Sequence, residues 1–344
     1  MKLKIREYLN FEIIHHYDKN NGDEIKSTGN QFYVKSRGIE YLFQVPGKSK
    51  FLMKFRIVRR FLRYDKSNAV FNWKRDGVVI LFQWQILFFD LRKKELIFID
   101  RLKQCRNVLH SGISVTSDAI CFGEYGHNPN RQPVPIWKSI NDGKSFSVVK
   151  ELNEQKIKHI HGIYADKFSK SLWIVTGDFD GECFVIESKD SSFTNLEWFG
   201  DGSQKWRPVS LFFKLNEIIW VMDSPIQKAY LQIFDRGNKT LTEGQYFPGP
   251  VWYSKQFEDG DAVLQTSVEI GKEVNSRYSK VFYSKNLIDW EEVHKFKKDL
   301  FPMPFFKFGV IAFADGIQSK DDFVFFGEAL KNMDGRSAKA SLHK

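Results

Sequence analysis

The sequence predicts an all-β fold made of repeated four-stranded units, a six-bladed β-propeller. From Asn68 onward, short β-branched, apolar and aromatic runs alternate with turns rich in Asp, Gly, Asn and Lys. These runs group by fours, at a spacing close to the roughly 45 residues of a propeller blade, and 344 residues accommodate six such blades. Aromatic residues make up 16% of the chain, which suits sheets that stack face to face.

Five complete blades follow one another in the sequence. We assign them to residues 69–100, 107–152, 159–199, 207–247 and 251–296. A sixth blade has only two strands, within 305–328, whereas two strands within 31–45 are left over. We therefore expect the N-terminal strands to pair with the C-terminal blade and close the ring, which removes the open sheet edges. This gives a single propeller over residues 1–330, with closing strands at 31–45, a basic connector at 46–68 and a flexible tail at 331–344.

The connector contains a segment with helical periodicity, Phe51–Arg63. Phe51, Phe55, Val58 and Leu62 fall on one side of a helix, and four arginines fall on the other. Such a basic amphipathic helix suits peripheral contact with an anionic membrane. A connector packed against the propeller, or an extra strand, suits the same pattern, and we favour the packed connector.

Composition limits the compartment and the partners. No stretch approaches the roughly 18 apolar residues of a membrane span, and no apolar segment follows the basic N-terminus. Three unpaired cysteines (Cys105, Cys121 and Cys183) fit a reducing compartment, so we expect a cytoplasmic protein. The net charge of +10 favours an anionic partner or reflects a lysine-rich composition. No nucleic-acid-binding motif is present, so nucleic acid is not expected as a partner.

Three predicted strands end in similar corners. Ser139-Ile-Asn-Asp-Gly-Lys-Ser-Phe146 is the clearest, and weaker copies are Ser188–Phe193 and Ser284–Trp290. The clearest corner resembles the Asp-box of BNR-repeat proteins in the sialidase-like β-propeller superfamily, although Asn141 replaces the Asp of that motif. The resemblance covers roughly half the chain and implies a propeller whose Asp-boxes lie away from the active face. It also extends loosely to glycosyl-hydrolase-like proteins associated with bacterial polysaccharide.

Acidic residues recur where the second strand of each predicted blade ends. Five of the six blades have a carboxylate at this place: Glu124, Asp178, Asp223, Glu269 and Glu328. A pair of such groups could cleave a glycosidic bond, one as acid and the other as nucleophile or base. We expect Asp178, Glu124, Asp223, Glu269 and His161 to be the catalytic candidates.

Other polar and aromatic residues cluster at the starts of inner strands and in nearby loops. The residues expected to bind substrate are Arg207, His159, Arg131, Tyr125, Gln204, Trp206 and Trp252. Aromatic faces stack on sugar rings, and arginine binds carboxylates. His159 and His161 point to the same face of a strand, but two histidines alone are weak grounds for a metal. We therefore predict no metal and no cofactor.

These features favour a carbohydrate-active propeller, a glycoside hydrolase acting on an acidic bacterial polysaccharide or its precursor. The resemblance to sialidases is incomplete, because only Arg207 of the expected three arginines begins an inner strand. Two alternatives remain open. One is a non-catalytic propeller that binds a glycan or a protein, and the other is a metal-assisted polysaccharide lyase that uses the His pair.

Overall fold

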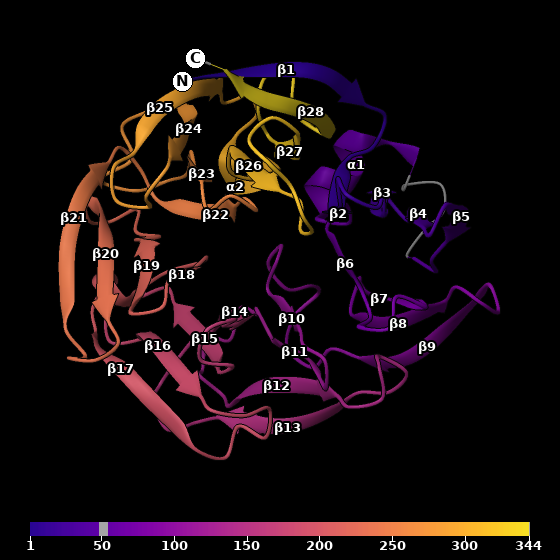
Figure 1. The fold of residues 1–344 in the computed structure, drawn as a ribbon, viewed down its shortest axis with the longest axis horizontal. Coiled ribbons are helices and arrows are strands. Elements are labelled where there is room, and N and C mark those ends of the chain that lie inside the picture. The colour runs from indigo at the N-terminus through magenta and orange to yellow at the C-terminus, as the bar shows by residue number, and fades with distance from the viewer. Residues whose placement is uncertain (48–53, 344) are drawn as a thin grey trace. The chain divides into compact units, whose positions relative to one another are not determined.

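The computed structural model describes residues 1–47 and 54–343, so residues 48–53 of the predicted connector lie outside the described residues. Within the described residues, the strands form seven four-stranded sheets (Figure 1). The fold is therefore a seven-bladed β-propeller, and the prediction of six blades is wrong. In the same part of the chain, no helix is long and apolar enough to cross a bilayer.

The chain divides into two compact units. The first comprises residues 1–66, 223–233 and 242–344, and the second comprises residues 67–222 and 234–241. Each unit is described by itself below.

Three sheets lie within the first unit. One has the order β2-β3-β4-β5, with bounds Ile13–Tyr17, Glu24–Thr28, Gln31–Ser36 and Ile39–Gln44. Another has the order β22-β23-β24-β25, with bounds Val251–Gln256, Ala262–Thr266, Tyr278–Ser284 and Glu291–Lys297. The third has the order β1-β28-β27-β26, with bounds Lys2–Leu9, Arg336–His343, Phe323–Glu328 and Val310–Phe313. Two short helices, α1 (Arg56–Leu62) and α2 (Met303–Phe306), belong to the same unit.

Three further sheets lie within the second unit. The first consists of β6-β7-β8-β9, with bounds Ser67–Phe71, Gly77–Phe82, Gln85–Asp90 and Glu95–Arg101. The next consists of β10-β11-β12-β13, with bounds Ile113–Val115, Ile120–Gly123, Val134–Ser139 and Ser147–Leu152. The third consists of β14-β15-β16-β17, with bounds His159–Ala165, Leu172–Gly177, Cys183–Ser188 and Leu196–Gly202. A short 3₁₀ helix, η2, covers Gln204–Trp206.

The remaining sheet has the order β18-β19-β20-β21, with bounds Phe212–Phe213, Glu217–Val221, Ala229–Asp235 and Leu241–Phe247. The blades predicted between residues 69 and 296 therefore correspond to five observed sheets. Their buried strands, such as Gly77–Phe82 and Leu172–Gly177, are continuous apolar runs in the sequence, which is why they could be recognised.

The missing blade lies at the N-terminus. The prediction that residues 31–45 pair with the C-terminal strands is wrong. These residues instead contain β4 and β5 of a complete first blade. Its β2 strand includes His15 and His16, and its β3 strand reads Glu-Ile-Lys-Ser-Thr. So many polar residues conceal the strand pattern, although every residue of β2 is buried.

The N-terminal strand β1 pairs with the C-terminal strand β28. The pairing is antiparallel, from Lys2 opposite His343 to Leu9 opposite Ser337 (Figure 1). Residues 331–344, for which the sequence predicts a flexible tail, thus contribute β28 over Arg336–His343. This strand has few large apolar residues, but Ala338, Ala340 and Leu342 are buried at a spacing of two.

Helix α1 packs with its arginines inward. Arg59 pairs with Glu12, and Arg60 donates to Asp299 at 2.5 Å. Both arginines are buried, whereas Phe55, Ile57 and Phe61 are exposed. The described part of the segment thus contacts the rest of the unit through its buried arginines, whereas the sequence pattern suggests contact through its apolar side. Contact with a membrane stays a prediction.

The corner at Ser139–Phe146 forms the turn between β12 and β13. Gly143 N donates to Ser139 Oγ at 2.9 Å, and Ser145 N donates to Asn141 Oδ1 at 2.9 Å. Asn141 thus supplies the same kind of side-chain acceptor that an Asp would supply. Phe146 is buried in a core cluster with Phe122 and residues of the neighbouring β6–β9 sheet.

Candidate functional site

A cluster of ionisable side chains lies at one end of the β14–β17 sheet. His159 and His161 come from the start of β14, and Asp178 directly follows β15. The pairing of β14 with β15 skips one residue, because Ile160 is opposite Thr176 and Gly162 is opposite Val175. His161 is therefore the extra residue of a β-bulge, a feature that redirects a side chain and recurs beside functional sites.

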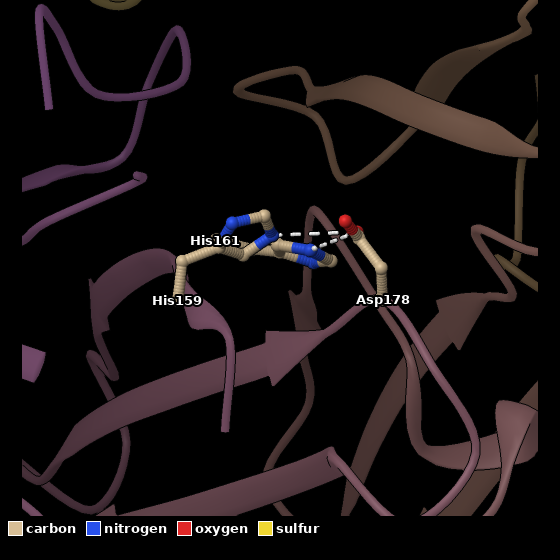
Figure 2. A group of neighbouring side chains, drawn as sticks. All are labelled: His159, His161 and Asp178. Carbon is tan, nitrogen blue, oxygen red and sulfur yellow. Dashed lines mark hydrogen bonds and ion pairs between the residues drawn. The ribbon is translucent and has the colours of Figure 1, made fainter. Parts of the chain in front are cut away.

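Both imidazole rings point at the same carboxylate oxygen (Figure 2). The Nε2 atoms of His159 and His161 each lie 3.3 Å from Asp178 Oδ1. The Nδ1 atoms lie 2.8 Å from backbone carbonyl oxygens, of Gly126 for His159 and of Pro208 for His161. A carbonyl oxygen can only accept, so Nδ1 of each ring carries the hydrogen. In a neutral ring, Nε2 then presents a lone pair to Asp178.

His159 is held in its neutral form. Burial lowers the pKa of His159 to about 4, and the nearby charge of Asp178 offsets this only in part. The Tyr125 ring covers the His159 ring at a centroid distance of 4.0 Å. At neutral pH the ring therefore keeps a free lone pair on Nε2.

Asp178 is surrounded by cations. Lys158 Nζ lies 2.6 Å from Oδ2, and Arg207 Nη2 lies 3.1 Å from Oδ1. Arg207 is itself oriented, because its Nη1 donates to the backbone oxygen of Asp178 at 2.7 Å and to Gln204 Oε1 at 3.2 Å. Burial alone would raise the pKa of Asp178, but the positive charge of Arg207, together with the contact of Lys158, holds that pKa below its usual range. Asp178 is thus ionised and cannot act as a general acid.

Gly177 provides the space in which these groups meet. A Cβ atom at this position would lie 2.7 Å from His161 Cε1 and 3.1 Å from Arg207 Cγ. The residue before Asp178 therefore has to be glycine for His161 and Arg207 to keep their positions.

An exposed aromatic ring flanked by cations lies beside the cluster. Phe179 is 51% exposed, and its ring centroid lies 5.3 Å from Lys158 Nζ and 5.4 Å from Arg131 Cζ. Arg131 is held by Glu182 at 2.6 Å. None of Lys158, Phe179 and Glu182 was expected at the site from the sequence. Lys158 directly precedes His159, and the other two flank Asp180-Gly181 in the loop after Asp178.

Glu124 has a different environment from Asp178. Its carboxylate is fully buried, where it accepts hydrogen bonds from Lys103 N at 2.8 Å, from Gln104 N and from Trp137 Nε1 at 2.8 Å. These donors satisfy both oxygens and anchor the loop before Cys105. The structure thus places Glu124 in the same unit as Asp178 but in a structural role.

The other residues selected from the sequence are distributed as follows. Tyr125, His159, His161, Asp178, Gln204, Arg207 and Arg131 come together in the second unit. Trp206 packs there against Trp220 and Phe234. Asp223, Glu269 and Trp252 belong to the first unit. There Asp223 is buried, and Glu269 Oε1 accepts from Ser267 Oγ at 2.6 Å.

Comparisons with known proteins define the class of this chain by its fold. No protein-family model matches it, and no curated protein matches it. Among solved structures, it is similar to the extracellular domain of a putative one-component system from B. thetaiotaomicron, with 9% identity and a TM-score of 0.59. That match covers 100% of this chain but only 40% of the other, so this chain spans less than half the length of that relative.

Two further structures match over nearly their whole length. One is the oligogalacturonate lyase from Vibrio parahaemolyticus, with 10% identity, a TM-score of 0.58, and coverage of 98% of this chain and 91% of the lyase. The other is the AfRom2 CNH domain, with 7% identity, a TM-score of 0.54, and coverage of 100% and 99%. Identities this low indicate the fold alone, so the protein is a β-propeller of a class that hosts several functions.

Proposed function

We propose that this chain binds an acidic carbohydrate at the site around Asp178. The observation that carries the proposal is the exposed Phe179 ring flanked by Lys158 and Arg131. An aromatic face of this kind stacks on a sugar ring, while ammonium and guanidinium groups bind the sugar's carboxylate.

The charge balance of the site supports an anionic ligand. Lys158, Arg207 and Arg131 supply three positive charges, and Asp178 and Glu182 supply two negative charges. These five groups leave one net positive charge next to the exposed ring. Among the neighbours in fold, the oligogalacturonate lyase is named for an acidic oligosaccharide, which agrees with this choice of ligand.

Hydrolysis by a pair of carboxylates is less well supported than binding. Such a mechanism requires one protonated carboxyl group, but the contacts of Asp178 with Lys158 and Arg207 favour its ionised form and hold its pKa below the usual range, against the effect of burial. Both oxygens of Glu124 are occupied by fixed donors. Kinship with the sialidase-like superfamily remains part of the proposal, supported by the hydrogen-bonded corners at Ser139, Ser188 and Ser284.

A second candidate function is eliminative cleavage of the same kind of ligand. It is favoured by the fixed cations, because charge that develops on a uronate carboxylate is stabilised by preorganised positive groups. Cleavage of this kind leaves a double bond conjugated with the carboxylate, so its product is detected by ultraviolet absorbance.

The test is calorimetric titration with oligogalacturonates and with neutral oligosaccharides of the same length. We expect the acidic series alone to bind, and Phe179→Ala or Lys158→Met to weaken binding at least tenfold. A matched control is Phe168→Ala, because Lys167 Nζ lies 5.1 Å from the exposed Phe168 ring elsewhere in the same unit. Equal binding of neutral and acidic sugars, or an equal effect of the control, would refute the proposal.

A further inference from the structure

We infer that His159, His161 and Asp178 form a binding site for a divalent transition-metal ion. The ligand atoms are Nε2 of each histidine and Oδ1 of the carboxylate. Nothing in the carbohydrate proposal requires this ion, so the two proposals can fail separately.

The distances between these atoms match those of metal ligands. The three ligand atoms lie within 4.8 Å of one another, and each Nε2 lies 3.3 Å from Oδ1. Bonds of about 2.1 Å, meeting at angles between octahedral and tetrahedral values, separate neighbouring ligand atoms by about 3.0–3.4 Å. The distance from each Nε2 to Oδ1 therefore suits an ion that both atoms coordinate, and the rings of Figure 2 already point toward such a position.

The hydrogen bonds on the far side of each ring support the same conclusion. Nδ1 of His159 donates to Gly126 O, and Nδ1 of His161 donates to Pro208 O. Protein metal sites commonly fix the histidine tautomer in this way, with the lone pair of the other nitrogen directed at the ion. With Nδ1 as the donor, the Nε2 lone pair of each ring is directed toward Asp178 Oδ1. A cation between these atoms would accept all three donor atoms.

The position of His161 is set by two unusual features of the backbone. His161 is the extra residue of a bulge, and Gly177 leaves the space that its ring occupies. Both features serve the convergence of the rings on Asp178. Two imidazoles and one carboxylate are the ligand types of Zn²⁺, Mn²⁺, Fe²⁺ or Ni²⁺ sites rather than of Ca²⁺ or Mg²⁺ sites.

The positive charges near the proposed metal ion favour an anion as its further ligand. Lys158 and Arg207 already contact Asp178, so a divalent ion would bring the local charge to three positive units. Such a site calls for an anion as a further ligand. Where the proposed acidic carbohydrate is that anion, the metal and the carbohydrate should each raise the affinity of the other by the same factor.

The test uses the full chain, stripped of metal with a chelator, and titrates it with Zn²⁺ and with Co²⁺ as a spectroscopic probe. We expect one ion per chain and a Co²⁺ visible spectrum that reports nitrogen and oxygen ligands. His159→Asn and Asp178→Asn should each lower the Zn²⁺ affinity at least about tenfold. The matched control is His127→Asn, because His127 is an exposed histidine of a neighbouring loop. The Zn²⁺ affinity of this variant should equal that of the wild type.

Absence of saturable binding by the stripped chain, or an equal loss in His127→Asn, would overturn the assignment. Gly177→Ala keeps all three ligand residues but displaces the His161 ring, so it should weaken Zn²⁺ binding even where the other variants fold poorly. Zn²⁺ binding without any binding of oligogalacturonate would support the metal site and refute the carbohydrate proposal. Oligogalacturonate binding by a chain that takes up no metal would do the reverse.

Discussion

Glu328 offers a quantitative test of the ion pairs in the first unit. It ends β27, and its carboxylate lies 3.3 Å from the buried ammonium of Lys307, which also contacts Asp65 at 2.7 Å. Burial alone would raise the pKa of Glu328, but the positive charges of Lys307, Lys66 and Arg56 outweigh it and lower the pKa from 4.5 to about 2.

The free energy involved follows from this difference in pKa. A carboxyl group with a pKa about 2.5 units lower in the folded than in the unfolded chain contributes about 3 kcal/mol to stability at neutral pH. Because the folded pKa is the lower one, the contribution is complete above the unfolded value of 4.5 and is lost as the pH falls toward 2. At pH 3, about 1.4 kcal/mol should remain.

The perturbation is Glu328→Gln, measured by urea unfolding of both chains between pH 7 and pH 2.5. We expect the variant to be less stable than the wild type by about 3 kcal/mol at pH 7, with the difference shrinking as the pH falls. Glu292→Gln is the control, because its partner Lys280 lies 2.7 Å away in a partly exposed pair. It should change stability by less than about 0.5 kcal/mol at every pH. A difference for Glu328→Gln that stays constant from pH 7 to pH 2.5 would show that the charge of Glu328 is not what stabilises the fold.

Three further predictions test other parts of the structure. Phe146→Ala should cost about 3–5 kcal/mol in unfolding experiments, because the ring is buried beside Phe122, while the binding of oligogalacturonate and Zn²⁺ by the folded variant stays unchanged. Gly177→Ala should cost about 1–3 kcal/mol from overpacking, since the added methyl group meets His161 at 2.7 Å; a neutral effect in thermal unfolding would contradict that geometry. Phe61→Ser should reduce co-sedimentation with anionic vesicles if residues 51–63 contact a membrane, because Phe61 is 51% exposed, and a wild-type chain that stays in the supernatant would end that prediction.

The sequence predicted the propeller class but not the number of blades, and the reason lies in the polarity of particular strands. Strands such as Gly77–Phe82 are buried on both faces and appear as continuous apolar runs. By contrast, β2 carries His15 and His16, which are buried polar residues. Likewise, β28 buries small residues, Ala338 and Ala340. The histidines interrupt the apolar pattern of β2, and β28 buries mainly small side chains, so neither strand was predicted and the ring closure was assigned to other strands.

The sequence shows that a carboxylate recurs where second strands end, but it does not show what each carboxylate does. The described structure gives these residues different partners: backbone N–H groups for Glu124, Ser267 for Glu269, and Lys307 for Glu328. Two of these arrangements, at Glu124 and Glu328, satisfy a buried charge and hold a loop or strand in place, a structural requirement at any blade end.

Asp178 differs from the others because two histidine rings and two cations converge on its carboxylate. His159 and His161 lie on β14, Arg207 follows the η2 helix, and Lys158 precedes β14. Sequence spacing does reveal the histidine pair, but the bulge that turns His161 toward Asp178 and the contact between Gly177 and Arg207 arise only from the packing of adjacent strands. The sequence pattern alone could therefore identify Asp178 as a candidate. The orientation of the His159 and His161 rings toward Asp178 depends on the fold. That convergence distinguishes a site able to hold an ion and an anionic ligand from a buried carboxylate that only stabilises its blade.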